Sequence, residues 1–167
     1  MKFHTVLLAL TTVFGASTIC ASTNHDAPAA TSVVSEISWM TDFEAAKSLA
    51  KEQSKPLFLY FTGSDWCPWC IKMNTQILST PEFAQALSQK MIFVKVDFPR
   101  QTKLDKATKE QNDKLSKTFG VQGFPTVILL DSDGQRIEKL SFQAGGGAVY
   151  AKKVLDILEQ HAKKSAG

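Results

Sequence analysis

The sequence predicts an α/β fold in which a central mixed β-sheet carries helices on both faces. Three observations favour this class. Helical and strand patterns alternate along residues 37–163, the apolar run at 56–61 is typical of a strand buried on both faces, and a hairpin pattern near the C-terminus adds an antiparallel pair. The chain has 167 residues and is 44% hydrophobic, which is enough for one well-buried core. We therefore expect a single domain.

The first predicted helix spans about 42–53. Thr41 can cap it and Glu44 can reach back to the cap, which is the capping-box pattern of a helix start. Apolar side chains then recur on one face of the helix. The next elements, in order, are a strand at 56–61, a helix from the cysteine pair to about Leu78, a short helix started by Thr80 and Pro81, and a strand from Met91 to Asp97.

A charged segment, residues 98–118, opens the second half of the chain and has few apolar positions before Phe119. We expect it to form a loop and a weakly amphipathic surface helix whose outer face is solvated. The remaining predicted elements are a strand at 126–130, a hairpin turn at 131–134, a partner strand at 136–142 and a last helix at about 148–162.

Two cysteines three residues apart are the most informative feature of the chain. Cys67 and Cys70 enclose Pro68 and Trp69, and Trp66 precedes them, just after the predicted buried strand. Cys67 is therefore expected at a helix N-terminus, where unpaired N–H groups and the helix dipole favour a thiolate over a thiol. Pro68 suits the first helical position, and Cys70 follows one turn later. The pair is predicted to open and close a disulfide.

Three other roles for the cysteine pair fit less well. A disulfide that closes four residues removes little entropy from the unfolded chain. It would stabilise the fold by about 2 kcal/mol at most, which is little for a structural disulfide. Zinc needs four ligands, but the sequence has no second cysteine pair and its three histidines are isolated. Haem attachment requires a histidine directly after the second cysteine, where Ile71 stands. We expect redox chemistry and no metal site.

The N-terminus has the pattern of a secretory signal peptide. Lys2 is followed by an apolar run and then by small residues. We predict a signal peptide at residues 1–21, with cleavage after Ala21 or Ser22. Residues 22–36 are rich in Ser, Thr, Ala and Asn without apolar periodicity, so they are expected to be a disordered lead-in.

Cleavage would leave Cys67 and Cys70 as the cysteines of the mature chain. Lipidation of Cys20 is a minor alternative, because Ile19 is a poor residue before a lipoprotein cleavage site. A lone cysteine pair in an exported chain indicates a compartment in which disulfides form, and the C-terminal sequence is not a signal for retention in the endoplasmic reticulum. We therefore expect the periplasm. The small net charge of +3 gives no reason to expect binding to nucleic acid.

Three motifs resemble the thioredoxin superfamily: residues 66–70 after a buried strand, residues 120–126 before another strand, and residues 131–134 at the hairpin. The resemblance implies a thioredoxin fold over most of the predicted domain. It also implies that the peptide bond before Pro125 is cis and faces the cysteines, and that the backbone of Phe124 pairs with an extended segment of the substrate.

Within the superfamily, residues 61–67, the signal peptide and the insertion at 98–118 look like the small periplasmic disulfide reductases of the DsbH type. The chain departs from thioredoxins in one important place. Thioredoxins carry a buried acid before the first cysteine as a proton relay, and here that place holds Phe61, or Tyr60 if the turn is one residue longer. Lys95 resembles the lysine that partners that acid, although an ordinary strand-edge charge is an equally good interpretation.

The predicted function is that of a thiol-disulfide oxidoreductase acting as a reductase of disulfides in periplasmic proteins. Trp69 stands where strong DsbA-type oxidants carry histidine, which favours reduction over oxidation. Cys67 is expected to be the exposed, low-pKa thiol. The predicted site comprises the nucleophile Cys67, the resolving Cys70, the loop residues Trp66, Pro68 and Trp69, and the substrate-binding residues Phe124 and Pro125.

We expect no cofactor beyond the redox-active disulfide. The expected partners are exported proteins with disulfides and a membrane electron donor that, by resemblance, looks like a DsbD-type transporter, and we expect a monomer. Two alternatives stay open. The same residues run backwards in a dithiol oxidase that introduces disulfides, and the chain could instead be a binding module or holdase that uses the cis-proline groove.

Overall fold

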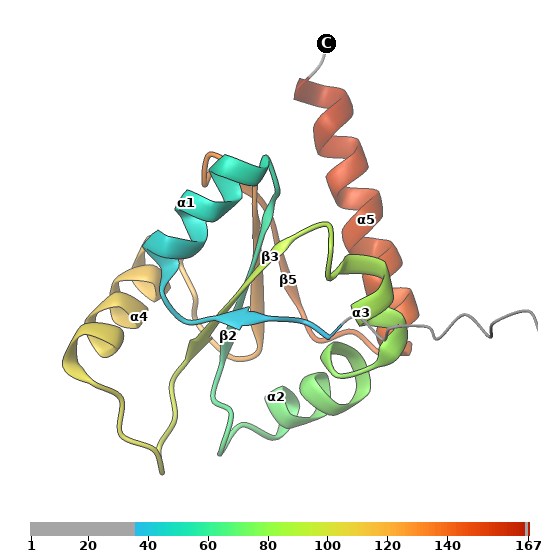
Figure 1. The fold of residues 1–167 in the computed structure, drawn as a ribbon. Helices are drawn as coiled ribbons and strands as arrows, with labels where there is room; N and C mark the ends of the chain where they lie inside the picture. Colours follow the sequence, from blue (N-terminus) through green and yellow to red (C-terminus); the bar gives the residue numbers. More distant parts are fainter. Residues whose placement is uncertain (1–35, 166) are drawn as a thin grey trace, which may run out of the picture. The chain divides into compact units, whose positions relative to one another are not determined.

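A five-stranded mixed β-sheet organises the chain, and the computed structural model describes residues 36–165 and 167 (Figure 1). The predicted signal peptide and all of the predicted lead-in except Glu36 lie outside the described residues. The elements are β1 (Trp39–Met40), α1 (Phe43–Gln53), β2 (Leu57–Thr62), α2 (Pro68–Met73), a π-helix η1 (Asn74–Leu78), α3 (Pro81–Leu87), β3 (Ile92–Asp97), α4 (Lys106–Thr118), β4 (Thr126–Leu130), β5 (Arg136–Ser141) and α5 (Gly146–Ser165).

Strand β2 lies at the centre of the sheet, whose order is β1-β3-β2-β4-β5. It runs parallel to β3 and antiparallel to β4, and β5 closes one edge antiparallel to β4. All six residues of β2 are buried, as expected of a strand covered on both faces. The prediction of a mixed sheet with an antiparallel hairpin at its edge is confirmed.

Alternate side chains of β2 point into two separate cores. Phe58 and Tyr60 pack in a cluster with residues of η1, α3 and α5, whereas Leu59 and Phe61 pack in a second cluster with residues of α1 and α4. Figure 1 shows α1 and α4 on one side of the sheet and α3 and α5 on the other. Each large side chain buried in this way contributes about 1.5–3 kcal/mol. Helices on both faces are thus confirmed.

Helix α1 begins differently from the capping box that the sequence predicts. Asp42, not Thr41, is the N-cap, and its carboxylate accepts a hydrogen bond from the N–H of Ala45 at 3.0 Å. An aspartate cap also places a negative charge at the positive end of the helix dipole. The side chain of Gln111 in α4 bonds the N–H of Phe43 and the carbonyl of Thr41, so a distant helix fixes this start.

Strand β1 is absent from the sequence prediction. It pairs parallel with β3 and has only two residues. Two residues are too few to show a periodic pattern in the sequence. Trp39 nevertheless has a structural role, because its ring packs against the rings of Phe58, Tyr60 and Phe93 at 5.4–6.2 Å between centroids. The strand anchors the beginning of the domain to the sheet.

The other predicted elements agree with the structure within about two or three residues at their ends, with two additions. The helix that follows the cysteines widens into the π-helix η1 after Met73. The charged segment forms α4 with an exposed outer face, as expected, but Asn112 and Leu115 are buried on its inner side. The longest helix is α5, and among the described residues none is both long and apolar enough to cross a membrane.

Candidate active site

The cysteine pair lies where β2 ends and α2 begins, as the sequence predicts. Cys67 is the N-cap of α2 and has an extended backbone, and Pro68 occupies the first turn. The Cys67 sulfur accepts a hydrogen bond from the N–H of Cys70 at 3.2 Å. The two cysteines form a disulfide. Once the disulfide opens, a negatively charged sulfur at the N-cap is stabilised by the helix N–H groups and the helix dipole, as a capping carboxylate is, and this favours the thiolate.

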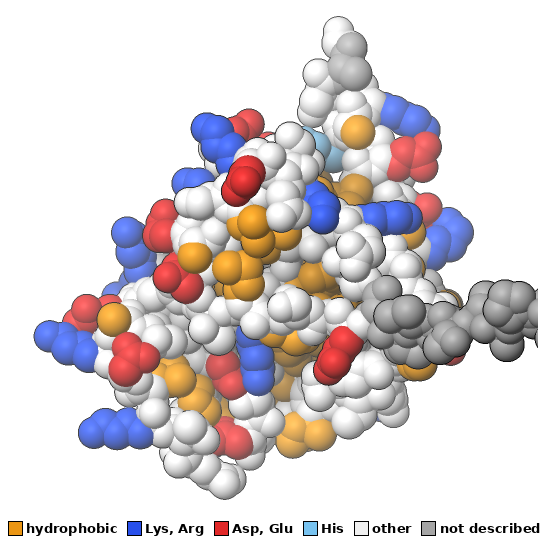
Figure 2. Space-filling model, viewed as in Figure 1, with side chains coloured by type: hydrophobic (Ala, Val, Ile, Leu, Met, Phe, Trp, Pro, Cys, Tyr) orange, Lys and Arg blue, Asp and Glu red, His pale blue; other side chains and the backbone are white. Residues whose placement is uncertain are grey.

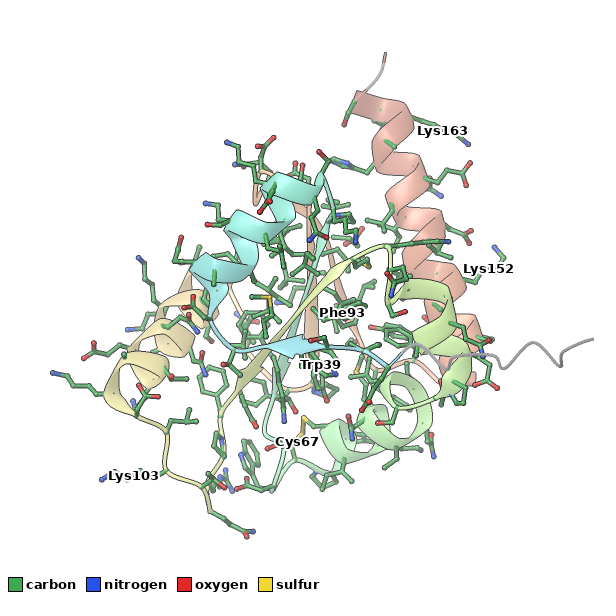
Figure 3. All side chains as sticks on the ribbon, in the orientation of Figure 1. Trp39, Cys67, Phe93, Lys103, Lys152 and Lys163 are labelled. Atoms are coloured by element: carbon green, nitrogen blue, oxygen red, sulfur yellow. A yellow bond between two sulfur atoms is a disulfide. The ribbon has the colours of Figure 1, made fainter. Side chains whose placement is uncertain are left out.

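Both cysteines are largely covered, which corrects the expectation that Cys67 is exposed. Cys67 has 5% of its surface accessible and Cys70 has 1%. The reason is the direction of the Cys67 sulfur, which points inward to the sulfur and the N–H of Cys70 rather than out to solvent. Cys67 still has the larger accessible fraction, while Pro68 and Trp69 between the cysteines are exposed. Figure 3 shows Cys67 at the end of the sheet where α2 starts.

Trp66 is held against the turn that leads from β2 to the cysteines. A β-carbon at Gly63 would overlap the Trp66 indole, so only glycine permits this packing. The indole N–H donates to the carbonyl of Phe98 at 2.7 Å, and the ring meets that of Phe124 edge-on at 6.0 Å between centroids. The residue before the first cysteine is therefore fixed by two other loops.

Tyr60, not Phe61, occupies the place beneath the cysteines where thioredoxins are expected to carry a buried acid. Its hydroxyl donates to the carbonyl of Cys70 at 3.1 Å, whereas Phe61 points into the opposite core. Burial raises the pKa of Tyr60, a hydrogen bond with Thr62 lowers it, and the negative charge of Asp97 raises it. At neutral pH the group beneath Cys70 is therefore an uncharged hydroxyl.

A small polar cavity of about 140 Å³ lies beside Cys70. The residues that line it are Tyr60, Thr62, Ser64, Cys70, Ile71, Asn74 and Lys95. Lys95 forms an ion pair with Asp97 at 3.3 Å, and Asp97 also accepts hydrogen bonds from the N–H and the hydroxyl of Ser64. Lys95 and Asp97 are two residues apart on one strand, so their side chains share a face. Lys95 is thus more than a strand-edge charge, because it lines this cavity.

The loop before β4 brings Phe124 to the same site. The peptide bond between Phe124 and Pro125 is cis, Pro125 is buried, and the hydroxyl of Thr126 donates to the carbonyl of Gly123 at 2.8 Å. The ring of Phe124 lies between those of Trp66 and Phe98, stacked on the latter at 5.0 Å between centroids. The structure thus brings two of the predicted site residues, Trp66 and Phe124, into contact.

On the helix side of the cysteines lies an exposed aromatic residue. Trp69 is 55% accessible and packs against Phe142 at 5.4 Å between ring centroids. The Lys72 ammonium lies over both rings, 5.1 and 5.4 Å from their centres. An exposed tryptophan beside a redox-active pair is a contact surface of the kind that an incoming polypeptide can use.

Sequence reasoning did not identify Phe98, Arg100 or Phe142 as residues of this site. Phe98 and Arg100 belong to the charged segment that follows β3, and no local pattern marks them. They reach the site because their loop folds back on residues more than thirty positions earlier in the chain. The predicted strand boundary at 142 places Phe142 at a strand end, but only the fold brings it to Trp69.

Comparisons with known proteins agree with this site. Residues 43–162 match the thioredoxin-like domain family. The chain is 37% identical over 123 residues to "Disulfide bond reductase DsbH" of Chlamydia pneumoniae, and the alignment covers 74% of each chain. A solved structure of a DsbH oxidoreductase has a TM-score of 0.71 at 36% identity and covers 74% of this chain and 85% of its own.

A more distant similarity is to the C-terminal domain of DsbD from Neisseria meningitidis in its oxidised form. That structure has a TM-score of 0.51 at 27% identity, with 68% of this chain and 90% of the domain covered. The family match extends from α1 into α5 and therefore includes the cysteine pair, the Phe124 loop and the whole sheet except β1. The chain belongs to the thioredoxin-like family of the thioredoxin superfamily, and within it to the DsbH type.

Proposed function

We propose that this protein is a thiol-disulfide oxidoreductase that reduces disulfides in exported proteins. The observation that carries the proposal is the position of Cys67 at the N-cap of α2, where its sulfur accepts the N–H of Cys70. That position favours a thiolate, which is the form that attacks a disulfide. The similarity to a protein named as a disulfide bond reductase supports reduction as the direction.

The reaction consists of two exchange steps between sulfur atoms. The Cys67 thiolate attacks one sulfur of the substrate disulfide, a mixed disulfide forms, and the other substrate sulfur leaves with the electron pair and takes up a proton. Cys70 then loses its proton and attacks the Cys67 sulfur, which releases the second substrate sulfur as a thiolate. The substrate gains two electrons, and the protein returns to the Cys67–Cys70 disulfide.

Two features of the site support these steps. The cavity beside Cys70 places the hydroxyl groups of Tyr60 and Ser64 and the ammonium of Lys95 next to that buried thiol, so polar groups surround the sulfur when it loses its proton. On the outer side, Phe124 and Pro125 are proposed to pair their backbone with an extended substrate segment, as strand addition requires. The exposed ring of Trp69 would cover the other flank of the substrate.

Reduction of insulin separates an enzyme from a binding module. We expect the wild-type protein to reduce insulin in the presence of a chemical electron donor, and Cys67→Ser to abolish the activity. We expect Cys70→Ser to accumulate mixed disulfides that collapse with reductant, because attack persists while resolution does not. A double-serine variant that accelerates the reaction as well as the wild type would make the cysteines incidental.

Equilibration with glutathione separates a reductase from an oxidase. A reduction potential of the Cys67–Cys70 pair near −270 mV, roughly that of thioredoxin, supports reduction, and one near about −120 mV supports a dithiol oxidase. Trp69 lies between the cysteines, and its indole carries no charge that could hold the thiolate at a very low pKa. We therefore expect a value closer to the reducing end of this range.

We also propose that the protein works in the periplasm and receives electrons from a membrane donor of the DsbD type. The signal-peptide pattern at residues 1–21 and the DsbH-type sequence support this location. Expression in a Gram-negative bacterium followed by osmotic shock tests it. The protein should appear in the shock fluid with an N-terminus near Ser22 or Thr23, and its cysteines should become oxidised when the DsbD-type transporter is deleted.

A further inference from the structure

The loop after β3, residues 98–101, is fixed to the turn that carries the cysteines. Besides the bond from Trp66 to the carbonyl of Phe98, the carboxylate of Asp65 accepts hydrogen bonds from the backbone N–H groups of Arg100 and Gln101 at 2.7–3.1 Å. These contacts join residues that are more than thirty positions apart in the sequence. The loop therefore has a defined position next to Cys67 although its tip is exposed.

Arg100 places a cation on the aromatic ring that precedes the nucleophile. The central carbon of its guanidinium lies 3.7 Å from the centroid of the Trp66 ring. Within residues 36–165, no carboxylate oxygen lies within 4.0 Å of its guanidinium nitrogens, and the nearby Asp65 carboxylate is occupied by backbone N–H groups. Stacking on Trp66 limits the motion of the side chain while leaving its N–H groups available to a ligand.

A hollow of about 440 Å³ borders Arg100, and Trp66 is not among its lining residues. Phe98 and Leu104 supply apolar lining, and Lys103 supplies a second cation. Lys109 and Asp113 also line it, but they pair with each other at 2.8 Å. The remaining charge in the hollow is therefore positive. Figure 3 shows Lys103 and Cys67 toward the same end of the protein.

Phe98 links the hollow to the proposed substrate-binding loop, because it lines the hollow and its ring stacks on that of Phe124. On the face shown in Figure 2, Lys and Arg side chains are interspersed with Asp and Glu side chains. The cation on Trp66 is thus a local feature beside the cysteines. The Arg100 guanidinium is positively charged, so we expect it to bind a negatively charged group. In a polypeptide substrate that group is a carboxylate.

We propose that Arg100 determines specificity: it selects substrate segments that carry aspartate or glutamate next to the cysteine under attack, with Lys103 as a secondary contact. The proposal rests on the disulfide-exchange function above. Substrate sulfur is attacked at Cys67, so a residue flanking that sulfur passes close to Trp66 and the guanidinium held over its ring. An ion pair formed there stabilises the encounter without altering the sulfur chemistry.

Two synthetic peptides test this selection. Each is closed by one disulfide, and they differ only in whether the residues that flank the cysteines are glutamate or glutamine. The measured quantity is the ratio of the second-order rates at which the fully reduced protein reduces the two peptides. This ratio is insensitive to any change in the reactivity of Cys67 itself, because such a change acts on both peptides alike.

For the wild-type protein we expect the glutamate peptide to react about two to five times faster, which is the range that an exposed ion pair gives. Arg100→Gln should bring the ratio to about 1, and Arg100→Glu should invert it. The backbone N–H of residue 100 is kept in both variants, so the bonds to Asp65 and the fold should persist. The preference should fade near 1 M salt, where the Debye length is about 3 Å.

Arg136→Gln is the matched control, because Arg136 is the other arginine of the chain and is exposed on β5. It should keep the wild-type ratio. Equal ratios in the wild type and in Arg100→Gln, with both peptides reduced, would overturn the proposal for Arg100 and leave the proposed function intact. A wild-type protein that reduces neither peptide would instead contradict the proposed function.

Discussion

Tyr60 gives the resolving cysteine a neutral hydroxyl where thioredoxins are expected to have an acid. The hydroxyl bonds the Cys70 carbonyl and lines the cavity beside the thiol. Burial is the main cause of the raised pKa of Tyr60, so the group stays protonated through the physiological range. It therefore serves as a polar contact and not as a base. The base for Cys70 must be water or another group that reaches the cavity.

Tyr60→Phe should slow the resolving step and move its pH dependence upward, because losing a hydroxyl makes the cavity less polar and so disfavours the Cys70 thiolate. Ellman's reagent measures the two steps separately: attack by Cys67 releases the first thionitrobenzoate, and resolution by Cys70 releases the second. The stability loss should be about 1 kcal/mol, since a hydrogen bond is lost.

Tyr150→Phe is the control for the effect of Tyr60→Phe. Tyr150 is the other tyrosine, is equally buried, and donates its hydroxyl to the carbonyl of Ser141 at 3.2 Å. Loss of the Tyr150 hydroxyl should lower the free energy of unfolding by a similar amount. It should leave the release of the second thionitrobenzoate unchanged. If both variants shift the second release alike, the effect of Tyr60 is one of general stability.

Asp65 should lose its bonds to the loop at an unusually acidic pH. The backbone N–H of Arg100, and then that of Gln101, lower the pKa of Asp65 from 3.8. A carboxylate whose folded-state pKa is depressed contributes its stabilisation above the unfolded value, and this is lost as the pH falls through the folded value. The amide resonances of Arg100 and Gln101 should therefore titrate together at a pH below 3.8. Titration at or above that value would contradict the hydrogen bonds from Arg100 and Gln101 to the Asp65 carboxylate.

At the scale of the elements, the start of α1 separates the predicted cap from the observed one. Asp42 supplies the side chain that accepts the N–H of Ala45, while Thr41 contributes its backbone carbonyl to Gln111. We expect Asp42→Ala to lower the free energy of unfolding by about 1 kcal/mol, the usual cost of losing an N-cap. Thr41→Ala should cost much less. Urea unfolding of the two variants measures this difference. A larger loss of stability in Thr41→Ala than in Asp42→Ala would show that Thr41 is the cap, as the capping-box prediction has it.

The elements that the sequence predicts well are those with strong local patterns. The apolar run before the cysteines gives β2 with its boundary shifted by one residue, and β4 falls at 126–130 as expected. The elements that it misses depend on distant partners. β1 exists because Trp39 meets three rings from β2 and β3. The change from α2 to the π-helix η1 is also missed, because the spacing of apolar residues does not distinguish a π-helix from an α-helix.

The candidate site divides in the same way. The spacing of Cys67 and Cys70, with Pro68 after the first, is enough to place a sulfur at a helix start, because the physics involved is local to one turn. The covering of Cys67, the stacking of Arg100 on Trp66 and the cavity beside Cys70 are tertiary. These three features arise where three loops meet at one end of the sheet. A single sequence does not show which loops lie close together in space.

At the scale of the whole molecule, the predicted domain boundary at residue 37 leads to a prediction that concerns β1. A chain that starts at Glu36 keeps Ile37, which is buried, and Trp39, whose ring packs on the central strands. A chain that starts at Thr41 lacks both but keeps the cap of α1, so the two truncations differ in β1 and its approach alone. Neither removes any residue of the cysteine site.

We expect the chain from Glu36 to unfold at the same urea concentration as the mature protein and to reduce insulin at the same rate. The chain from Thr41 should be less stable by about 3 kcal/mol, because removing a packed tryptophan leaves Phe58, Tyr60 and Phe93 without a partner on that side. Its activity should persist at low temperature, where enough of the protein stays folded. Equal stability of the two truncations would show that β1 is dispensable and that the folded domain begins at α1.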